Sequence, residues 1–300
     1  STTNYFFYSL SQIEEHTRYA SVWYELFEIQ PKITNKPDAI IPDWQKSPAI
    51  ELRNVSFAYP DTDTMVLKNI SMAIKSGEKV AFVGLNGAGK TTLVKLISRV
   101  YEPIEGVITL DGVDIRDIDL EYLRENLAVL FQDFSNFQMT TREAIAIGRP
   151  NQPIDDTKVV WAADMSGAID FIKEFKHGFN QLIWKGFKDG VELSKGQFQR
   201  MAVARIFYRD ALISILDEPT ASIDAVAEEK IFESLETKMG NKTVILISHR
   251  FSTVKNADKI AVIEHGELKE FGSHKQLMKK KSGRYAELYT MQASRYLEGE

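Results

Sequence analysis

The sequence contains no cysteine among its 300 residues, so disulfide bonds and thiolate metal sites are excluded. It has no apolar run close to the roughly 20 residues that a membrane-spanning helix needs, and no signal peptide is recognisable. The aromatic run at residues 5–8 is short and is soon followed by Glu14 and Glu15. We therefore expect this chain to be soluble. Its start at Ser1, without Met, indicates a fragment or a processed chain.

The chain also lacks an excess of positive charge, because its formal net charge at pH 7 is −5. Proteins that bind nucleic acid mainly through phosphate contacts carry basic surfaces. The charge balance therefore argues against such a function without excluding it. With 44% hydrophobic residues, the chain is long enough for one large or two small domains.

Residues 84–92 (GLNGAGKTT) fit the pattern G-x-x-x-x-G-K-[ST] of a phosphate-binding P-loop. The apolar run at 79–83 predicts a buried strand before this loop, and a helix is expected to start after it. The glycines let backbone N–H groups turn toward phosphate oxygens, and the helix N-terminus adds positive charge. Lys90 is expected to reach the β- and γ-phosphates of a nucleotide, and Thr91 to ligate Mg²⁺.

Strands alternate with helices along most of the chain, which predicts an α/β fold with a P-loop core and a mostly parallel sheet. An antiparallel β subdomain and an inserted helical subdomain at about 134–210 complete the predicted fold. The predicted strands are 50–57, 70–74, 79–83, 107–110, 127–131, 213–216, 243–247 and 260–263. The predicted helices are 141–147, 157–163, 168–174, 195–208, 226–239, 276–281 and 284–297.

The first 47 residues differ in character from the rest. Helical periodicity predicts a helix over 1–30 that Pro31 ends, and the proline-rich stretch 31–48 reads as a linker. This helix either packs on the following domain or is the end of something larger upstream. We therefore predict an N-terminal helix and linker at 1–47, a main domain at 48–290 and a tail at 291–300.

Two adjacent carboxylates follow one buried strand. The apolar run 213–216 ends at Asp217, where a carboxylate can hold the Mg²⁺ of a P-loop through water. Glu218 comes next and can face the γ-phosphate and polarise an attacking water. Either residue alone could simply form a turn, but the P-loop upstream favours a catalytic interpretation.

Residues 193–197 (LSKGQ) precede a long helical pattern, with Ser194 as a good N-cap. By itself this segment would be a capped helix start. It resembles the LSGGQ signature of ABC-type ATPases, and it lies upstream of the Asp217 strand as that family requires. The sequence departs from the signature at Lys195, where Gly is usual. Signatures with Lys at this position resemble those of some bacterial exporters of modified peptides such as lantibiotics.

The resemblance implies further roles, residue by residue. Tyr59 matches the aromatic residue that stacks on adenine, and Gln132 matches a glutamine that ligates Mg²⁺ and senses the membrane partner. Residues 221–224 (ASID) match the loop that contacts the opposite subunit, and His249 matches the histidine that contacts the γ-phosphate. The stretch 186–190 lacks the glutamate that exporters carry in the corresponding loop, which puts a coupling role for that loop in doubt.

These matches define the predicted site. The predicted catalytic residues are Glu218, His249, Lys90 and Gln132, and the predicted metal ligands are Thr91, Gln132 and Asp217. The predicted nucleotide-binding residues are Tyr59, Asn86, Gly87, Ala88, Gly89, Lys90, Thr91, Thr92, Ser194, Lys195, Gly196 and Gln197.

The resemblance implies an ATP- and Mg²⁺-dependent ATPase with a RecA-like core, which serves as the nucleotide-binding domain of an ABC exporter. Two copies would sandwich two ATP molecules head to tail, and an upstream transmembrane domain would hold them at the cytoplasmic face of a membrane. Residues 25–31 resemble the junction to such a domain. Alternatives are a soluble ABC ATPase that gates a nucleic-acid clamp, and a regulatory module without turnover. A P-loop GTPase is excluded, because the run at 241–244 (NKTV) begins like N-K-x-D but lacks its Asp.

Overall fold

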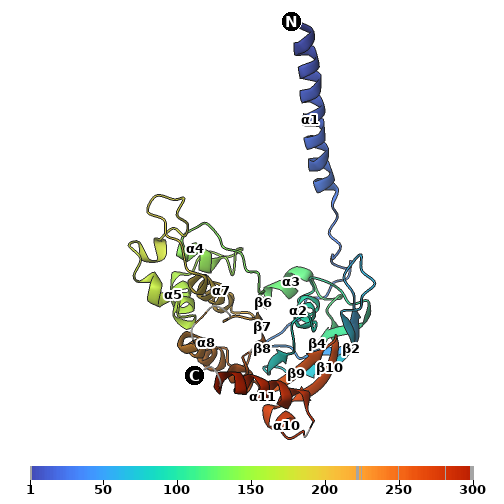
Figure 1. Cartoon of the computed structure of the whole chain (residues 1–300), viewed down its shortest axis with the longest axis vertical. Coiled ribbons are helices and arrows are strands. Elements are labelled where there is room, and N and C mark those ends of the chain that lie inside the picture. Colours follow the sequence, from blue (N-terminus) through green and yellow to red (C-terminus); the bar gives the residue numbers. More distant parts are fainter. Residues whose placement is uncertain (1, 221–222, 224, 249, 281, 298–300) are drawn as a thin grey trace. The chain divides into compact units, whose positions relative to one another are not determined.

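The computed structural model describes residues 2–220, 223, 225–248, 250–280 and 282–297. The chain divides into two compact units, residues 1–34 and residues 35–300. Figure 1 shows their helices and strands coloured along the sequence.

The first unit consists mainly of helix α1 (Thr2–Glu28), which ends shortly before Pro31, as the sequence predicts. No residue of α1 is buried, and large apolar side chains such as Phe7, Trp23 and Phe27 are exposed. Among the helices that the structure describes, none is both long enough and apolar enough to cross a membrane.

A mostly parallel sheet forms the centre of the second unit (Figure 1). Its strands, in spatial order, are β10 (Glu267–Gly272), β9 (Lys259–Glu264), β3 (Lys79–Val83), β8 (Thr243–Ile247), β7 (Ile213–Asp217) and β6 (Leu127–Leu130). All neighbouring pairs from β9 to β6 are parallel, and β10 pairs with β9 antiparallel. The carboxyl ends of β3, β6, β7 and β8 therefore meet at one edge, where ligands of open α/β sheets bind.

A smaller antiparallel sheet has the order β2 (Leu67–Ile74), β1 (Ile50–Phe57), β4 (Glu105–Leu110) and β5 (Val113–Asp114). It confirms the predicted antiparallel subdomain, and Leu52, Val55 and Phe57 of β1 are buried. One apolar cluster joins this sheet to the parallel sheet around helix α2 (Lys90–Ile97). The P-loop helix is thus packed between the two sheets.

The helical region predicted at 134–210 is present. It contains α4 (Thr141–Ala146), α5 (Asp156–Met165), α6 (Ile169–Ile172), the 3₁₀ turn η1 (Gly178–Asn180) and α7 (Lys195–Arg209). Its apolar core continues into β6 and β7 and into α8 (Ala225–Lys238). Elsewhere lie α3 (Leu120–Glu125), α9 (Phe251–Val254), α10 (His274–Met278) and α11 (Arg284–Leu297). Helix α11 includes residues 291–297 of the predicted tail.

The expected domain boundary at residue 48 stays a prediction. The second unit begins at Asn35, ahead of the expected start at residue 48. The Ile40 backbone N–H donates to the Asp117 carbonyl at 2.7 Å, and the Ser47 hydroxyl donates to the Leu212 carbonyl at 2.5 Å. These long-range bonds hold much of the expected linker against the second unit. The functional assignment of the parts stays a prediction.

Candidate nucleotide-binding site

The P-loop connects β3 to α2, as the sequence predicts. Gly89 is the N-cap of α2 with a φ of 104°, and no side chain caps this helix. A side chain would be strained at that φ, and a Cβ there would lie 2.7 Å from Leu67 Cδ2. The first N–H groups of α2 are therefore not taken by a side-chain cap, which is the arrangement that binds phosphate.

Lys90, the first residue of α2, turns its ammonium back over the loop. Its Nζ donates to the carbonyl oxygens of Gly84 at 2.9 Å and Leu85 at 3.0 Å. Burial lowers the pKa of Lys90, whereas the nearby Glu218 and Asp217 carboxylates act in the opposite direction. The lysine thus places a positive charge at the loop where phosphate groups would bind.

Thr91 and Asp217 meet at the carboxyl edge of the sheet. The Thr91 hydroxyl donates to Asp217 Oδ2 at 2.7 Å, and Asp217 is buried at the end of β7. The two residues are 126 positions apart in the sequence, and the strand order β3-β8-β7 brings them together. This contact joins the two predicted metal-binding motifs.

Glu218 follows β7 with a φ of 51°, in the left-handed region. Such a backbone conformation costs a non-glycine residue of order 1–3 kcal/mol and is common at functional sites. The Glu218 N–H donates to the Ile247 carbonyl at 3.0 Å. Gln132, which follows β6, donates its Nε2 to Glu218 Oε2 at 3.1 Å. The two predicted catalytic side chains are therefore within hydrogen-bonding distance.

These residues surround a cavity of about 690 Å³, a volume typical of small-molecule sites. The residues that line it are Tyr59, Val66, Asn86, Gly87, Ala88, Gly89, Lys90, Thr91, Thr92, Gln132, Asp217 and Glu218. All except Val66 were predicted from the sequence. Val66 was missed because a lone valine before a strand carries no chemical signal.

Tyr59 stands at this cavity between two aromatic neighbours. Its ring packs edge-on against Phe57 and Tyr101, with centroids 5.1 and 5.4 Å apart. Its hydroxyl lies 3.0 Å from Thr92 Oγ1 and accepts a hydrogen bond from Lys95 Nζ at 3.4 Å. These contacts hold an aromatic ring beside the P-loop, where adenine stacking is predicted.

The signature segment lies outside the lining of this cavity. Ser194 is the N-cap of α7 and forms a capping box with Gln197. Gln197 N–H donates to Ser194 Oγ at 3.2 Å, and Ser194 N–H donates to Gln197 Oε1 at 2.9 Å. Within this one chain, none of the four predicted signature residues, 194–197, is among the described residues that line the P-loop cavity.

Other predicted residues fall outside the described part of the chain. These are His249 and, in the expected subunit-contact loop, Ala221, Ser222 and Asp224. Ile223, between them, is buried.

The oxygen donors at this cavity suit Mg²⁺. The Thr91 hydroxyl, the Gln132 amide and the Asp217 carboxylate are oxygen ligands, which Mg²⁺ prefers, usually together with several waters. In the described part of the chain, no group of three or more His, Cys, Asp or Glu side chains forms a metal cage. The site therefore fits an ion that arrives with phosphate and water, not one held by protein ligands alone.

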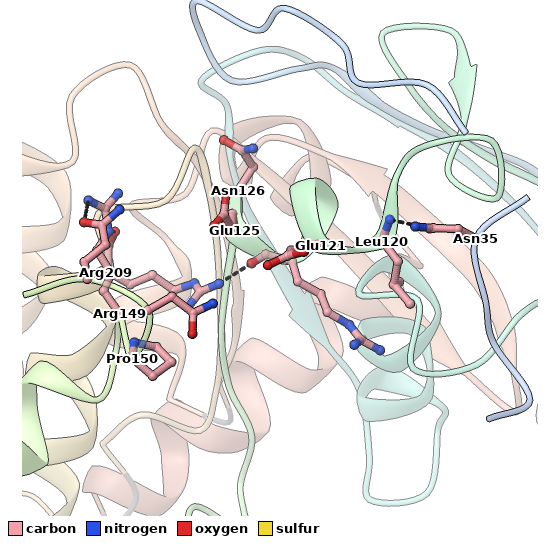
Figure 2. Close-up of a pocket in the computed structure, with 11 residues that line it drawn as sticks. Asn35, Leu120, Glu121, Glu125, Asn126, Arg149, Pro150 and Arg209 are labelled. Atoms are coloured by element: carbon pink, nitrogen blue, oxygen red, sulfur yellow. Dashed lines mark hydrogen bonds between the residues drawn. The ribbon is translucent and has the colours of Figure 1, made fainter. Parts of the chain in front are cut away.

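A second cavity, of about 570 Å³, lies next to α3 and the loop after α4. Arg149 and Arg209 lie on one side of it and Asn35 on the other (Figure 2). Arg149 Nε donates to the Arg209 carbonyl at 2.8 Å, and Arg209 Nε donates to the Leu127 carbonyl at 2.7 Å. Burial, with the repulsion of Arg149, lowers the pKa of Arg209 although Glu125 opposes the shift. Both arginines thus hold backbone carbonyls next to this cavity.

Comparison with known proteins points to one family. Residues 67–221 match the family described as ABC transporter. Over 278 residues the chain is 40% identical to an ATP-dependent lipid A-core flippase of Syntrophus aciditrophicus (strain SB), covering 92% of this chain and 45% of the flippase. It is 36% identical over 287 residues to the leukotoxin export ATP-binding protein LtxB of Aggregatibacter actinomycetemcomitans, covering 92% of this chain and 40% of that protein.

A solved structure agrees with these matches. The fold is similar to that of a bacterial Atm1-family ABC exporter with ATP bound, with a TM-score of 0.84 and 32% sequence identity, over 94% of this chain and 48% of that chain. The chain thus spans less than half the length of each of these three relatives.

Proposed function

Because this chain belongs to the ABC transporter family, we propose that it is the nucleotide-binding domain of an exporter and hydrolyses ATP to drive transport. One observation carries this proposal: Lys90, the Thr91–Asp217 pair and the Gln132–Glu218 pair converge on one cavity. Binding, metal and general-base groups are the parts that phosphoryl transfer requires. The predicted roles of the site residues remain part of this proposal.

The proposed mechanism follows from these positions. The α2 N-terminus and Lys90 bind the phosphates and stabilise the negative charge on the phosphate oxygens. Thr91, Gln132 and Asp217 would hold Mg²⁺, Asp217 through water, and the ion would neutralise phosphate charge. Glu218 takes the proton of a water that attacks the γ-phosphorus while the bond to the β-phosphate oxygen breaks, which releases ADP and phosphate. His249 is proposed to orient this water.

We further propose that a second copy of the chain completes each site. Ser194 and its neighbours Lys195, Gly196 and Gln197 stand outside the cavity of their own chain. In a head-to-tail dimer, this segment of one chain would bind the γ-phosphate held by the other. Hydrolysis would remove these contacts and open the dimer, and the motion would drive a transmembrane domain at the cytoplasmic face of a membrane.

Export is the function that the relatives favour. Two of those described above are named as export proteins and one as a flippase, whereas a nucleic-acid clamp has no counterpart among them. A peptide cargo is the narrower proposal, and it rests on Lys195 in the signature alone. Salt-dependent binding of DNA by the chain would support the clamp instead.

The test is Glu218→Gln, which keeps the shape of the side chain and removes its basicity. We expect ATP binding within about twofold of the parent and hydrolysis reduced by roughly 100-fold or more, because general-base catalysis contributes 10²–10⁴-fold. Glu233→Gln, at an exposed position on α8, is the matched control and should hydrolyse ATP at the parental rate. A Glu218→Gln variant with parental hydrolysis would falsify the proposed role of Glu218.

A further inference from the structure

Gln199 is a buried polar residue on α7, the helix that Ser194 caps. It is 3% exposed, and its Nε2 donates a hydrogen bond to the backbone carbonyl of Glu218 at 2.9 Å. The bond crosses from the helical region to the end of β7. The signature helix therefore holds the main chain of the proposed general base within the same subunit.

The bond matters because of the conformation that it holds. Glu218 has a φ of 51°, and its N–H is already held by the Ile247 carbonyl. The bond from Gln199 fixes the following peptide through its carbonyl. Both peptide groups of Glu218 are thus anchored, one to β8 and the other to α7. A strained backbone conformation of this kind persists where several surrounding contacts hold it in place.

We propose that Gln199 is a positioning residue for ATP hydrolysis: it orients the Glu218 carboxylate and links it to the signature helix. This inference rests on the proposed function. In a head-to-tail dimer, Ser194 binds the nucleotide of the opposite site, whereas Glu218 serves the site of its own chain. Gln199 lies five residues after Ser194 on the same helix. When Ser194 binds the nucleotide of the opposite site, this contact is therefore transmitted through the helix to Glu218 in the site of its own chain.

The test compares two substitutions at this position with a matched control. Gln199→Leu removes the donor, and Gln199→Glu keeps the shape but presents a carboxylate to the Glu218 carbonyl. Both should lower kcat by about 10- to 100-fold, the effect of a small misplacement of a catalytic group, with the Kd for ATP within about twofold of the parent. The control is Gln181→Leu: Gln181 is as buried and donates to the Leu182 and Asp189 carbonyls outside the cavity. It should lose stability with kcat unchanged.

A double-mutant cycle separates positioning from general damage. If Gln199 acts through Glu218, Gln199→Leu should lower the residual rate of Glu218→Gln by less than about twofold, because residues that act as a unit are non-additive. Parental kcat in both Gln199 variants, an equal loss in Gln181→Leu, or additive effects would each overturn the inference. A parent that binds ATP without hydrolysing it would instead contradict the proposed function, so the two failures are distinguishable.

Discussion

Two helix N-termini in this chain are proposed to bind nucleotide phosphates, α2 in the site of its own chain and α7 in the site of a second chain, and they are built in opposite ways. The N-cap of α2 is Gly89, which has no side chain to offer. The N-cap of α7 is Ser194, whose hydroxyl and whose N–H both bond with Gln197. In α2, no side-chain cap takes up the first backbone N–H groups, which stay available to a ligand. In α7, the side chains of Ser194 and Gln197 satisfy two backbone N–H groups.

This difference indicates the order in which the two termini bind. Helix α2 gains most from an anion, because phosphate supplies the acceptors that its cap lacks. Helix α7 is stable without an anion, but Ser194 Oγ accepts a bond from Gln197 N–H and still has a proton to donate. In the proposed dimer, α2 would therefore be the primary nucleotide site and α7 the later contact, supplied by a second chain.

The largest expected effect is that of Gly89→Ala, which adds a methyl group at the N-cap of α2. Its Cβ would lie 2.7 Å from Leu67 Cδ2 and 3.2 Å from the Val66 carbonyl, at a φ of 104°. Relief of this strain should displace the loop N–H groups and weaken ATP binding by roughly 100-fold, equivalent to about 3 kcal/mol. Titration calorimetry with ATP measures the loss. Gly112→Ala is the control, because at φ 83° it carries similar backbone strain, its Cβ meets no atom within 4 Å and it does not line the cavity. Equal losses in both variants would contradict the proposed contact.

The next largest effect is expected for Ser194→Ala, and a matched variant on another helix separates helix capping from phosphate binding. Ser194→Ala removes a cap and should lower the free energy of unfolding by about 1 kcal/mol. Ser273 forms the same kind of capping box with Gln276 on α10, so Ser273→Ala should cost a similar amount. Only Ser194→Ala should also lower ATPase activity, by about 100-fold, as expected for loss of one transition-state donor. Urea unfolding and steady-state ATPase assays measure the two effects. Equal ATPase rates in the two variants would show that the Ser194 hydroxyl only caps its helix.

Some features of this site can be predicted from the sequence, and others cannot. The P-loop and the Asp217–Glu218 pair were found because short local patterns, a strand followed by its loop or carboxylates, carry the chemistry. The Gln199–Glu218 contact was not found, because a glutamine within a helix resembles any surface residue until the helix is packed. Its partner is a main-chain carbonyl, which leaves no trace in the sequence.

The fold was missed in places for similar reasons. Strand β10 (ELKEFG) is an edge strand with charged side chains, and such strands lack the apolar alternation used to recognise them. The boundary expected near residue 48 rests on the prolines before it, and it stays a prediction. The bonds from Ile40 and Ser47 to residues more than 70 positions away could not be read from local composition.

The smallest expected effect lies at the other end of α7, where Asp210 is the C-cap. Burial would raise the pKa of Asp210, but a hydrogen bond from Lys242 and the charges of Lys242 and Lys158 hold it below its usual value. The charged carboxylate therefore stabilises the fold above about pH 4, and this contribution is lost as the pH falls through the lowered pKa.

Asp210→Asn removes this charge but tolerates the left-handed backbone at φ 57°. It should lower the free energy of unfolding at pH 7 by less than about 1 kcal/mol, because the side chain is 46% exposed and its ion pairs are screened. Urea unfolding should show the gap between parent and variant closing as the pH falls below about 4, with ATPase activity at pH 7 unchanged. A gap that is independent of pH would assign the effect to packing. A loss of ATPase activity would mean that both ends of α7, not its N-terminus alone, take part in function.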